Sequence, residues 1–413
     1  MNTTRNRYTR RCFLKTAGAA GLGSLLSAAD DMSDAFAAPS EIIQPEDTVP
    51  RRPFGKTGEN VSILALGGYF DALNNQSLLK QAILSGVTYW ESSFSCKGGK
   101  EGYGVYLKHN PQDRKKIFLS AKTSSKDPVK MGQELDETLS VLNTSYIDYF
   151  VIHAVDNAED LNADIRKWAD QKKSEGKIKF FGFSTHQNME DCIIRAAKFG
   201  WIDGIMTTYN YRLMNTDKMK MAVDACVKAG IGLSAIKSQA ELTNPKATIG
   251  LESPTAMKLT AQFMKKGFTL QQAKLKAIWE NPHIASICSL MPNMTILVSN
   301  VAAALDKTSL STHDLNLLKR YSDETSSCYC SGCANVCETA ISGKVPISKV
   351  MRYLMYYHSY GDRDRARYLY NALPIQMRKD IANLDYFESE KKCPQKIAIG
   401  KFMRQAAKEL MSS

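Results

Sequence analysis

Several features are missing from this 413-residue sequence, and each absence excludes a class of protein. Beyond the first forty residues, no apolar run approaches the roughly 20 residues that a transmembrane helix needs, so we expect no membrane span. No Gly-x-Gly-x-x-Gly follows the first candidate strand, which weakens the case for an open dinucleotide-binding sheet. The net charge of +12 is spread along the chain and not massed in one arm. Nucleic acid is therefore not expected as a partner.

The first 37 residues have the composition of an export signal. Arg10 and Arg11 open the pattern Arg-Arg-x-Phe-Leu-Lys, an apolar stretch follows from Ala17 to Ala29, and small residues flank Phe36. The pattern resembles the twin-arginine signal, which addresses folded proteins to an export receptor. A basic amphipathic helix is the alternative interpretation. We predict a signal peptide over residues 1–37, the twin-arginine translocase as a partner, and a periplasmic or otherwise extracytoplasmic location.

Short apolar segments alternate with amphipathic ones after a proline-bounded linker over residues 38–50. Helical patterns cover residues 131–143 and 160–176. Eight candidate strands, rich in β-branched and aromatic residues, begin at Ser62, Val87, Ile117, Ile147, Lys179, Gly204, Gly230 and Ala285. Eight buried strands alternating with helices predict an α/β fold in which a parallel sheet closes into a (β/α)8 TIM barrel over residues 51–310. An open doubly wound sheet is the rival architecture.

Ionisable side chains end three successive candidate strands. Glu91 ends the second, Lys122 the third and His153 the fourth. Each alone is compatible with an ordinary solvated or hydrogen-bonded residue. A barrel, however, gathers the carboxyl ends of its strands at one mouth, where active sites of this architecture lie. The pattern therefore predicts a shared site containing all three.

These segments together resemble the aldo/keto reductase family. The stretch RRPFGKTGENVSILALGG resembles the family's opening, and GVTYWESS its Gly-x-x-x-x-Asp-Thr-Ala segment. SAKTSS, IDYFVIHAV and KIKFFGFSTHQ resemble its third, fourth and fifth strands, and the resemblance extends from about Arg51 to Leu305. It implies reduction of a carbonyl by NADPH. In that family a tyrosine donates the proton, a lysine held by an aspartate lowers the tyrosine pKa, and a histidine orients the substrate oxygen.

The resemblance assigns four catalytic positions. The lysine corresponds to Lys122, the histidine to His153, and the aspartate to Glu91, which keeps the charge and adds a methylene. The tyrosine position holds Cys96, whose sulfur reaches roughly 3–4 Å less far from the backbone than a phenolic oxygen. Cys96 is therefore interpreted as an acid acting through water, a reactive thiolate, or a metal ligand with His153 and Glu91. The last role would suit a metal-assisted hydrolase or isomerase.

The resemblance also places a nicotinamide cofactor, NADP(H) or NAD(H), at the ends of the later strands. Leu290 stands where the family has a phosphate-binding glycine, and no Lys or Arg occurs between Pro282 and Lys307. A 2′-phosphate would lack its strongest partners there. The residues assigned to the cofactor are Ser184, Thr185, Tyr209, Asn210, Lys237 and Asn300.

The C-terminal residues 311–413 form a predicted helical module with a ferredoxin-like cysteine motif. CYCSGCANVCE supplies four cysteines, from Cys328 to Cys337, and KKCPQ supplies Cys393. Iron–sulfur ferredoxins use C-x2-C-x2-C-x3-C-P. Residues 351–374 predict two helices broken at Gly361. We predict one [4Fe–4S] cluster, with zinc or disulfides as alternatives, on Cys328, Cys330, Cys333 and Cys393.

Export and cofactor content support one interpretation. Iron–sulfur clusters and nicotinamide cofactors are installed in the cytoplasm, so a protein that needs them outside should cross the membrane folded. The sequence predicts an exported oxidoreductase acting on a carbonyl or sugar-like alcohol, with an electron-transfer partner as a further expectation. The alternative is a non-catalytic barrel that binds a small molecule.

Overall fold

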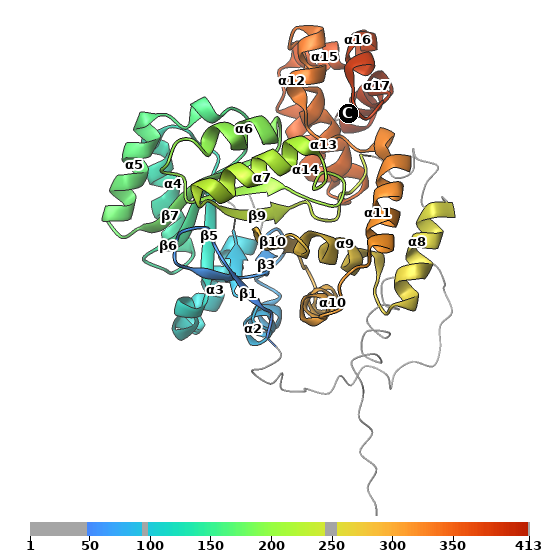
Figure 1. The fold of residues 1–413 in the computed structure, drawn as a ribbon. Coiled ribbons are helices and arrows are strands. Elements are labelled where there is room, and N and C mark those ends of the chain that lie inside the picture. The colour runs from blue at the N-terminus through green and yellow to red at the C-terminus, as the bar shows by residue number, and fades with distance from the viewer. Residues whose placement is uncertain (1–47, 93–97, 244–253, 412–413) are drawn as a thin grey trace, which may run out of the picture.

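Eight parallel strands form a closed barrel in chain order, with helices outside it (Figure 1). The computed structural model describes residues 48–92, 98–243 and 254–411, so the predicted signal peptide and Cys96 lie outside the described residues. The strands are β3 (Leu64–Gly67), β4 (Tyr89–Glu91), β5 (Phe118–Thr123), β6 (Ile147–Ile152), β7 (Ile178–Thr185), β8 (Gly204–Thr208), β9 (Gly232–Ile236) and β10 (Ile284–Leu290). Each overlaps a predicted strand, and the TIM-barrel prediction is confirmed.

Aromatic side chains close the amino-terminal end of the barrel. A hairpin of β1 (Arg51–Pro53) and β2 (Asn60–Ser62) covers this end. The ring centroid of Phe54 lies 5.2 Å from that of Tyr149 and 5.3 Å from that of Phe118. Gly232 leaves room for this ring, since a Cβ there would lie 2.7 Å from it. The opposite end, where the strands finish, remains for function.

Amphipathic helices cover the outside of the barrel. Asp127, Asn162 and Thr216 each accept a hydrogen bond from a first-turn N–H, and such a cap contributes about 1 kcal/mol. The helices are α2 (Gln76–Leu84), α3 (Gly99–His109), α4 (Pro128–Val141), α5 (Ala163–Ser174), α6 (Met189–Ala196), α7 (Asp217–Ala229), α8 (Pro254–Lys265), α9 (Leu270–Trp279) and α10 (Met294–Leu305). The two helices predicted from periodicity are α4 and α5.

The chain after the barrel is helical. Its helices are α11 (Thr312–Glu324), α12 (Ala334–Cys337), α13 (Ile347–His358), α14 (Arg363–Asn371), α15 (Ile375–Asn383), α16 (Phe387–Lys392) and α17 (Ile399–Leu410). As predicted, α13 and α14 are separated at Gly361, which has a φ of +68°. Figure 1 shows α12 to α17 gathered together beside one end of the barrel.

The helical module is docked on the carboxyl ends of the strands. The hydrogen bonds that cross this boundary include Asn188 N to Gly332 O (2.8 Å), Thr243 N to Cys328 O (2.8 Å), Arg352 Nη2 to His186 O (3.0 Å) and Ser359 Oγ to Leu242 O (2.5 Å). Gly332 has a φ of +83°, and a Cβ there would lie 2.5 Å from the His186 carbonyl oxygen. Only glycine allows this close approach.

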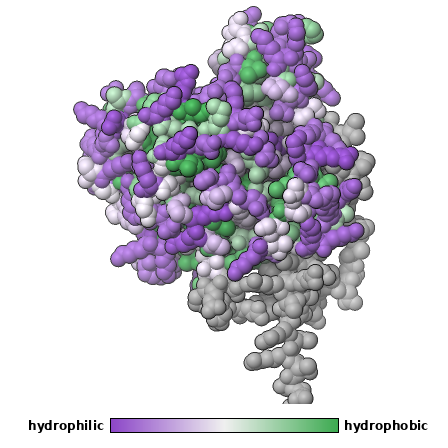
Figure 2. Space-filling view, in the orientation of Figure 1, coloured by the Kyte–Doolittle hydropathy of each residue, from purple (hydrophilic) through white to green (hydrophobic). Residues whose placement is uncertain are grey.

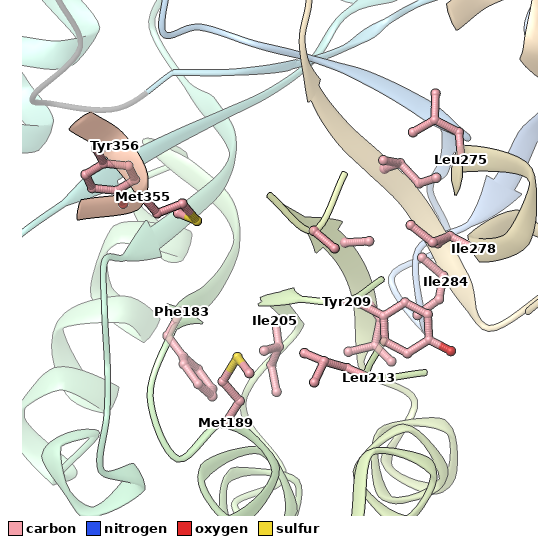
Figure 3. Packing of buried hydrophobic residues seen from close by; sticks show 14 of the residues in the cluster. Phe183, Met189, Ile205, Tyr209, Leu213, Leu275, Ile278, Ile284, Met355 and Tyr356 are labelled. Carbon is pink, nitrogen blue, oxygen red and sulfur yellow. The ribbon is translucent and has the colours of Figure 1, made fainter. Parts of the chain in front are cut away.

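Barrel and module share one buried hydrophobic cluster. Met355 and Tyr356 of α13 belong to the same cluster as Phe183 of β7 and Ile205 of β8 (Figure 3). Hydrophilic side chains cover most of the face seen in Figure 2. Among the described residues, no helix has the length and hydrophobicity needed to cross a membrane. The module is thus part of the folded body and forms one wall of the barrel mouth.

Candidate active site at the barrel mouth

A buried ion pair lies at the mouth. Glu91 ends β4, Lys122 lies near the end of β5, and their Oε1 and Nζ atoms are 2.8 Å apart. The two residues are only 6% and 8% exposed. The other carboxylate oxygen of Glu91 accepts from the Gly68 N–H (3.4 Å) and lies 3.8 Å from the Cys288 sulfur. Because the pair is nearly out of contact with water, its charges interact more strongly than a surface pair would.

Two histidines face each other on the next strands. His153 follows β6, His186 follows β7, and their Nε2 atoms are 3.2 Å apart. One ring must therefore donate this hydrogen bond and the other accept it. Burial, followed by the positive charges of Lys122 and Lys237, lowers the pKa of His153 to about 3. Burial also lowers the pKa of His186 well below its usual range, so both rings are neutral near pH 7.

A cavity of about 40 Å³ lies between the strand ends and the docked module. His186, Thr208 and Lys237 line it from the barrel, and Arg352 and Met355 line it from α13. Burial lowers the pKa of Lys237 to about 8; the Tyr356 phenol opposes this shift, and the neighbouring guanidinium groups add to it. The mouth therefore has a positive potential that is partly contributed by the C-terminal module.

Tyr356 of α13 stands at the same mouth. The Arg365 guanidinium lies 4.5 Å from the ring centroid of Tyr356 and 4.5 Å from that of Tyr69. Tyr69 follows β3 by two residues, directly after Gly68, whose N–H contacts Glu91. These contacts join the tail helix to the strand ends that carry the Glu91–Lys122 pair.

The pKa of Tyr356 is lowered although the side chain is buried. Burial alone would raise it, but positive charges outweigh burial; they belong to Lys237, Arg352, Arg365 and Lys122. In contrast, burial raises the pKa of Tyr353 and Tyr360, which lie three residues before and four residues after it. Tyr356 thus combines a hydroxyl group with the cationic surroundings that favour its ionised form.

The comparisons with known proteins agree with the barrel fold. The model described as "Aldo/keto reductase family" matches residues 64–244, the segment that carries Glu91, Lys122 and His153. The match covers this segment, and the rest of the chain lies outside the family model. No curated protein gives a significant match.

Solved structures of aldo/keto reductases share the barrel. One is the holo form of an aldo-keto reductase from Bacillus halodurans, with 16% sequence identity and a TM-score of 0.55, covering 66% of this chain and 96% of its own. Another is a thermostable aldo-keto reductase in complex with the inhibitor epalrestat, with 21% identity and a TM-score of 0.53, covering 66% of this chain and 100% of its own. At these identities the likeness shows the fold alone.

The residues predicted to bind the cofactor have different surroundings in this barrel. Ser184 and Thr185 end β7 and are fully buried; the Ser184 hydroxyl accepts from the Ala154 N–H (3.1 Å). Tyr209 packs in the hydrophobic cluster shown in Figure 3, where its hydroxyl accepts from Asn281 (2.8 Å).

The other predicted cofactor residues lie on three different elements. The Asn210 amide donates to the Tyr329 hydroxyl (3.0 Å) of the C-terminal module. Asn300 on α10 donates to the Ser289 hydroxyl (3.1 Å) on β10. Of the six predicted cofactor residues, only Lys237 is among those lining the mouth cavity.

Four cysteines surround a second cavity inside the module. Cys330, Cys333, Cys337 and Cys393 line it, whereas Cys328, which was predicted as a ligand, is not part of this lining. Burial raises the pKa of the Cys330 thiol to about 12. The described cysteines are all free thiols. Within the described ranges, no three His, Cys, Asp or Glu side chains converge closely enough to hold a single metal ion.

Sequence reasoning missed several residues of the mouth. His186 directly follows Thr185 in the segment KIKFFGFSTHQ, so its position at a strand end was the available signal. In the separate cysteine cavity, Cys337 keeps the x3 spacing after Cys333, whereas the predicted ligand set contains Cys328 in its place. Arg352 and Tyr356 had no such signal, because only the docking of α13 brings the tail to the barrel mouth.

Proposed function

We propose that this protein is an exported oxidoreductase that interconverts a carbonyl and an alcohol. The observation that carries the proposal is the buried Glu91–Lys122 pair, 2.8 Å apart, at the carboxyl ends of neighbouring barrel strands beside His153. Reduction of a carbonyl develops negative charge on its oxygen. A fixed ammonium in a nearly dry site stabilises that charge, and a neutral imidazole can orient the oxygen.

The cofactor that best suits the chain is a nicotinamide dinucleotide without a 2′-phosphate; when bound, it supplies or accepts hydride. The face after β10 exposes Leu290, Met294 and Ile296, each at least 37% exposed, and carries no basic side chain. Such a surface gives a 2′-phosphate no charged partner. NAD(H) is therefore our proposal in place of NADP(H).

Two groups are candidates for the proton donor. Cys96 occupies the family's tyrosine position but lies outside the described residues. Tyr356 has a buried hydroxyl among cations, and a lowered pKa brings an acid closer to the pH at which it must transfer a proton. We propose Tyr356 as the donor, supplied by the C-terminal module, while Glu91 keeps Lys122 in place.

The reductase proposal is tested by turnover. Purified protein with NADH and a panel of small aldehydes and ketones should oxidise NADH, and Lys122→Met should reduce kcat/KM by at least a hundredfold. Lys116→Met is the matched control, because that ammonium is 59% exposed and pairs with Asp113 outside the mouth. Equal activity of the two variants would contradict the proposal.

A binding barrel without catalysis is the second candidate. It is favoured by the replacement of the family's tyrosine by Cys96. If the wild-type protein binds a carbonyl compound but gives no turnover with NADH, NADPH or a chemical electron donor, this second function replaces the first.

The cysteine cavity supports one [4Fe–4S] cluster. Four thiols from the C-x2-C-x3-C run and from the Cys-Pro motif line one buried space, which fits the donor set of such a cluster. A four-iron cluster is held at its corners, so its thiolates stand further apart than those around one zinc ion. We propose Cys330, Cys333, Cys337 and Cys393 as the ligands, with Cys337 replacing the predicted Cys328.

The ligand set is tested with two matched serine variants. Protein purified anaerobically should be brown and contain about four irons per chain. Cys337→Ser should lose most of the iron, whereas Cys328→Ser should keep it. The reverse result would restore the ligand set predicted from the sequence, and colourless wild-type protein containing zinc would replace the cluster with zinc.

Export remains part of the proposal because a protein loaded with such cofactors must cross the membrane folded. The support is the Arg10-Arg11 pattern in the sequence. Replacing both arginines by lysine should leave the protein in the cytoplasm of the producing cell. Unchanged export of that variant would rule out the twin-arginine route.

A further inference from the structure

We propose that the mouth cavity binds a carboxylate group of the substrate, so that the oxidoreductase acts on a small 2-oxo or 2-hydroxy acid. The inference rests on the proposed function, whose substrate class it narrows. The cavity is built jointly by the ends of β7 to β9 and by α13, with Lys237 on one side and Arg352 on the other. Neither residue would meet the other without the docked module.

The charge balance of the mouth requires an anion. Buried cations in proteins are normally paired. Lys122 has Glu91 as its partner, and Arg365 lies 4.0 Å from Asp362. Within the described part of the chain, Lys237 and Arg352 are half-buried, line the cavity and form no ion pair; the Arg352 guanidinium donates one hydrogen bond, to the His186 carbonyl oxygen (3.0 Å).

One carboxylate, Glu241, also lines the cavity. It can offset one of the two positive charges. The remaining charge still favours an anionic guest, and a carboxylate between an ammonium and a guanidinium would satisfy both. Because the two histidines are neutral, they add no charge to this balance.

Hydrogen-bonding groups around the cavity lack partners. Ser348 is 3% exposed, and its hydroxyl has no hydrogen-bond partner. His186 is 6% exposed, and its Nδ1 also has none. Thr208 and Ser331 add further hydroxyl groups to the lining, and the Ser331 hydroxyl already accepts a hydrogen bond from the Gln395 amide (3.2 Å). Buried polar atoms are rarely left unpaired, so these groups indicate a bound polar guest or water.

The size of the cavity selects among anions. A volume of about 40 Å³ holds about three water-sized groups, since each needs roughly 10–15 Å³. A carboxylate has three heavy atoms and fits this space. Inorganic phosphate has five, and a nucleotide is far larger, so the cavity is suited to one end of a small acid.

Binding is tested on the anaerobically purified full-length protein, with pyruvate as the probe and methyl pyruvate as its neutral counterpart. Isothermal titration should show pyruvate binding at least tenfold more tightly than the ester and more tightly than inorganic phosphate. Arg352→Gln and Lys237→Met should each weaken pyruvate binding by about tenfold or more, as expected for loss of a charge-assisted hydrogen bond. Circular dichroism checks that both variants fold.

The control is Lys349→Gln. Lys349 lies on the same helix, its side chain is 47% exposed, and it faces Asp156 outside the cavity lining. This variant should bind pyruvate like the wild-type protein. Equal binding of pyruvate and its ester, tighter binding of phosphate, or equal losses in R352Q and K349Q would each overturn the proposal.

Failure of this inference can be separated from failure of the proposed function. Titration measures binding without turnover. Selective pyruvate binding without NADH oxidation would leave the carboxylate site standing and refute the reductase activity. Reduction of neutral ketones with no preference for acids would keep the activity and refute the carboxylate site.

Discussion

Removing the negative charge of Glu91 should destabilise the protein far more than removing a surface charge. Glu91→Gln leaves the Lys122 ammonium, 8% exposed, without its anion at 2.8 Å. An uncompensated charge of this kind costs about 3–5 kcal/mol in the free energy of unfolding. Adding Lys122→Met removes the ammonium that has lost this anion, so the double variant should recover at least about half of that loss.

The measurement is equilibrium unfolding in urea, followed by tryptophan fluorescence and far-ultraviolet circular dichroism. The control is Asp323→Asn, which breaks the Lys319–Asp323 pair of equal length, 2.8 Å, whose side chains are both 64% exposed. That loss should stay below about 1 kcal/mol. Equal free energies of unfolding for E91Q and D323N would show that the Glu91–Lys122 pair is not desolvated. So would a double variant that is no more stable than E91Q.

Three further predictions test the docking of the module, the proton donor and the stability of the protein at acid pH. Gly332→Ala should weaken the docking of the module, because the alanine Cβ would lie 2.5 Å from the His186 carbonyl oxygen of the barrel. Trypsin should then cleave the chain beyond residue 310 faster than in the wild-type protein. Tyr356→Phe should reduce carbonyl turnover at least tenfold with unchanged urea stability, whereas Tyr360→Phe should not affect turnover; equal effects would exclude Tyr356 as the donor. Burial raises the pKa of Asp314, but its hydrogen bond with Lys266 outweighs burial and lowers the pKa to about 2. The free energy of unfolding should therefore fall as the pH drops from about 4 to about 2, and this fall should be smaller in Asp314→Asn.

The barrel was predictable because its signals are local. Each strand is a short apolar run buried on both faces. In the helices between them, apolar residues recur every three to four positions, which indicates an amphipathic helix. The amino-terminal hairpin was less visible, since its short strands, Arg51–Pro53 and Asn60–Ser62, contain few apolar residues. The hairpin closes the end of the barrel through Phe54, whose ring contacts Phe118 and Tyr149 only once the barrel has folded.

The site was predictable only where it follows the barrel rule. Glu91, Lys122 and His153 end strands, so the architecture places them at one mouth. Arg352 and Tyr356 lie about 200 residues later on a helix whose apolar face indicates burial but not a partner. Sequence spacing cannot supply such tertiary contacts.

The pH dependence of acid binding gives a last test of the mouth. Burial lowers the pKa of Lys237 to about 8. The Tyr356 phenol raises this pKa and two neighbouring arginines lower it further. Below this pH the Lys237 ammonium is charged and attracts a carboxylate, and above it that charge is lost. Pyruvate affinity should therefore be highest below about pH 8 and fall by about tenfold toward pH 10.

Other titrating groups at the mouth must be separated from this effect. The histidines His153 and His186 are neutral throughout this range. Tyr356, whose pKa is lowered, would add a negative charge on ionisation and weaken binding in the same direction. Tyr356→Phe should therefore keep the decline that is due to Lys237, and Lys237→Met should remove it. A decline that persists in Lys237→Met and disappears in Tyr356→Phe would assign the titration to the phenol and remove Lys237 from the carboxylate site.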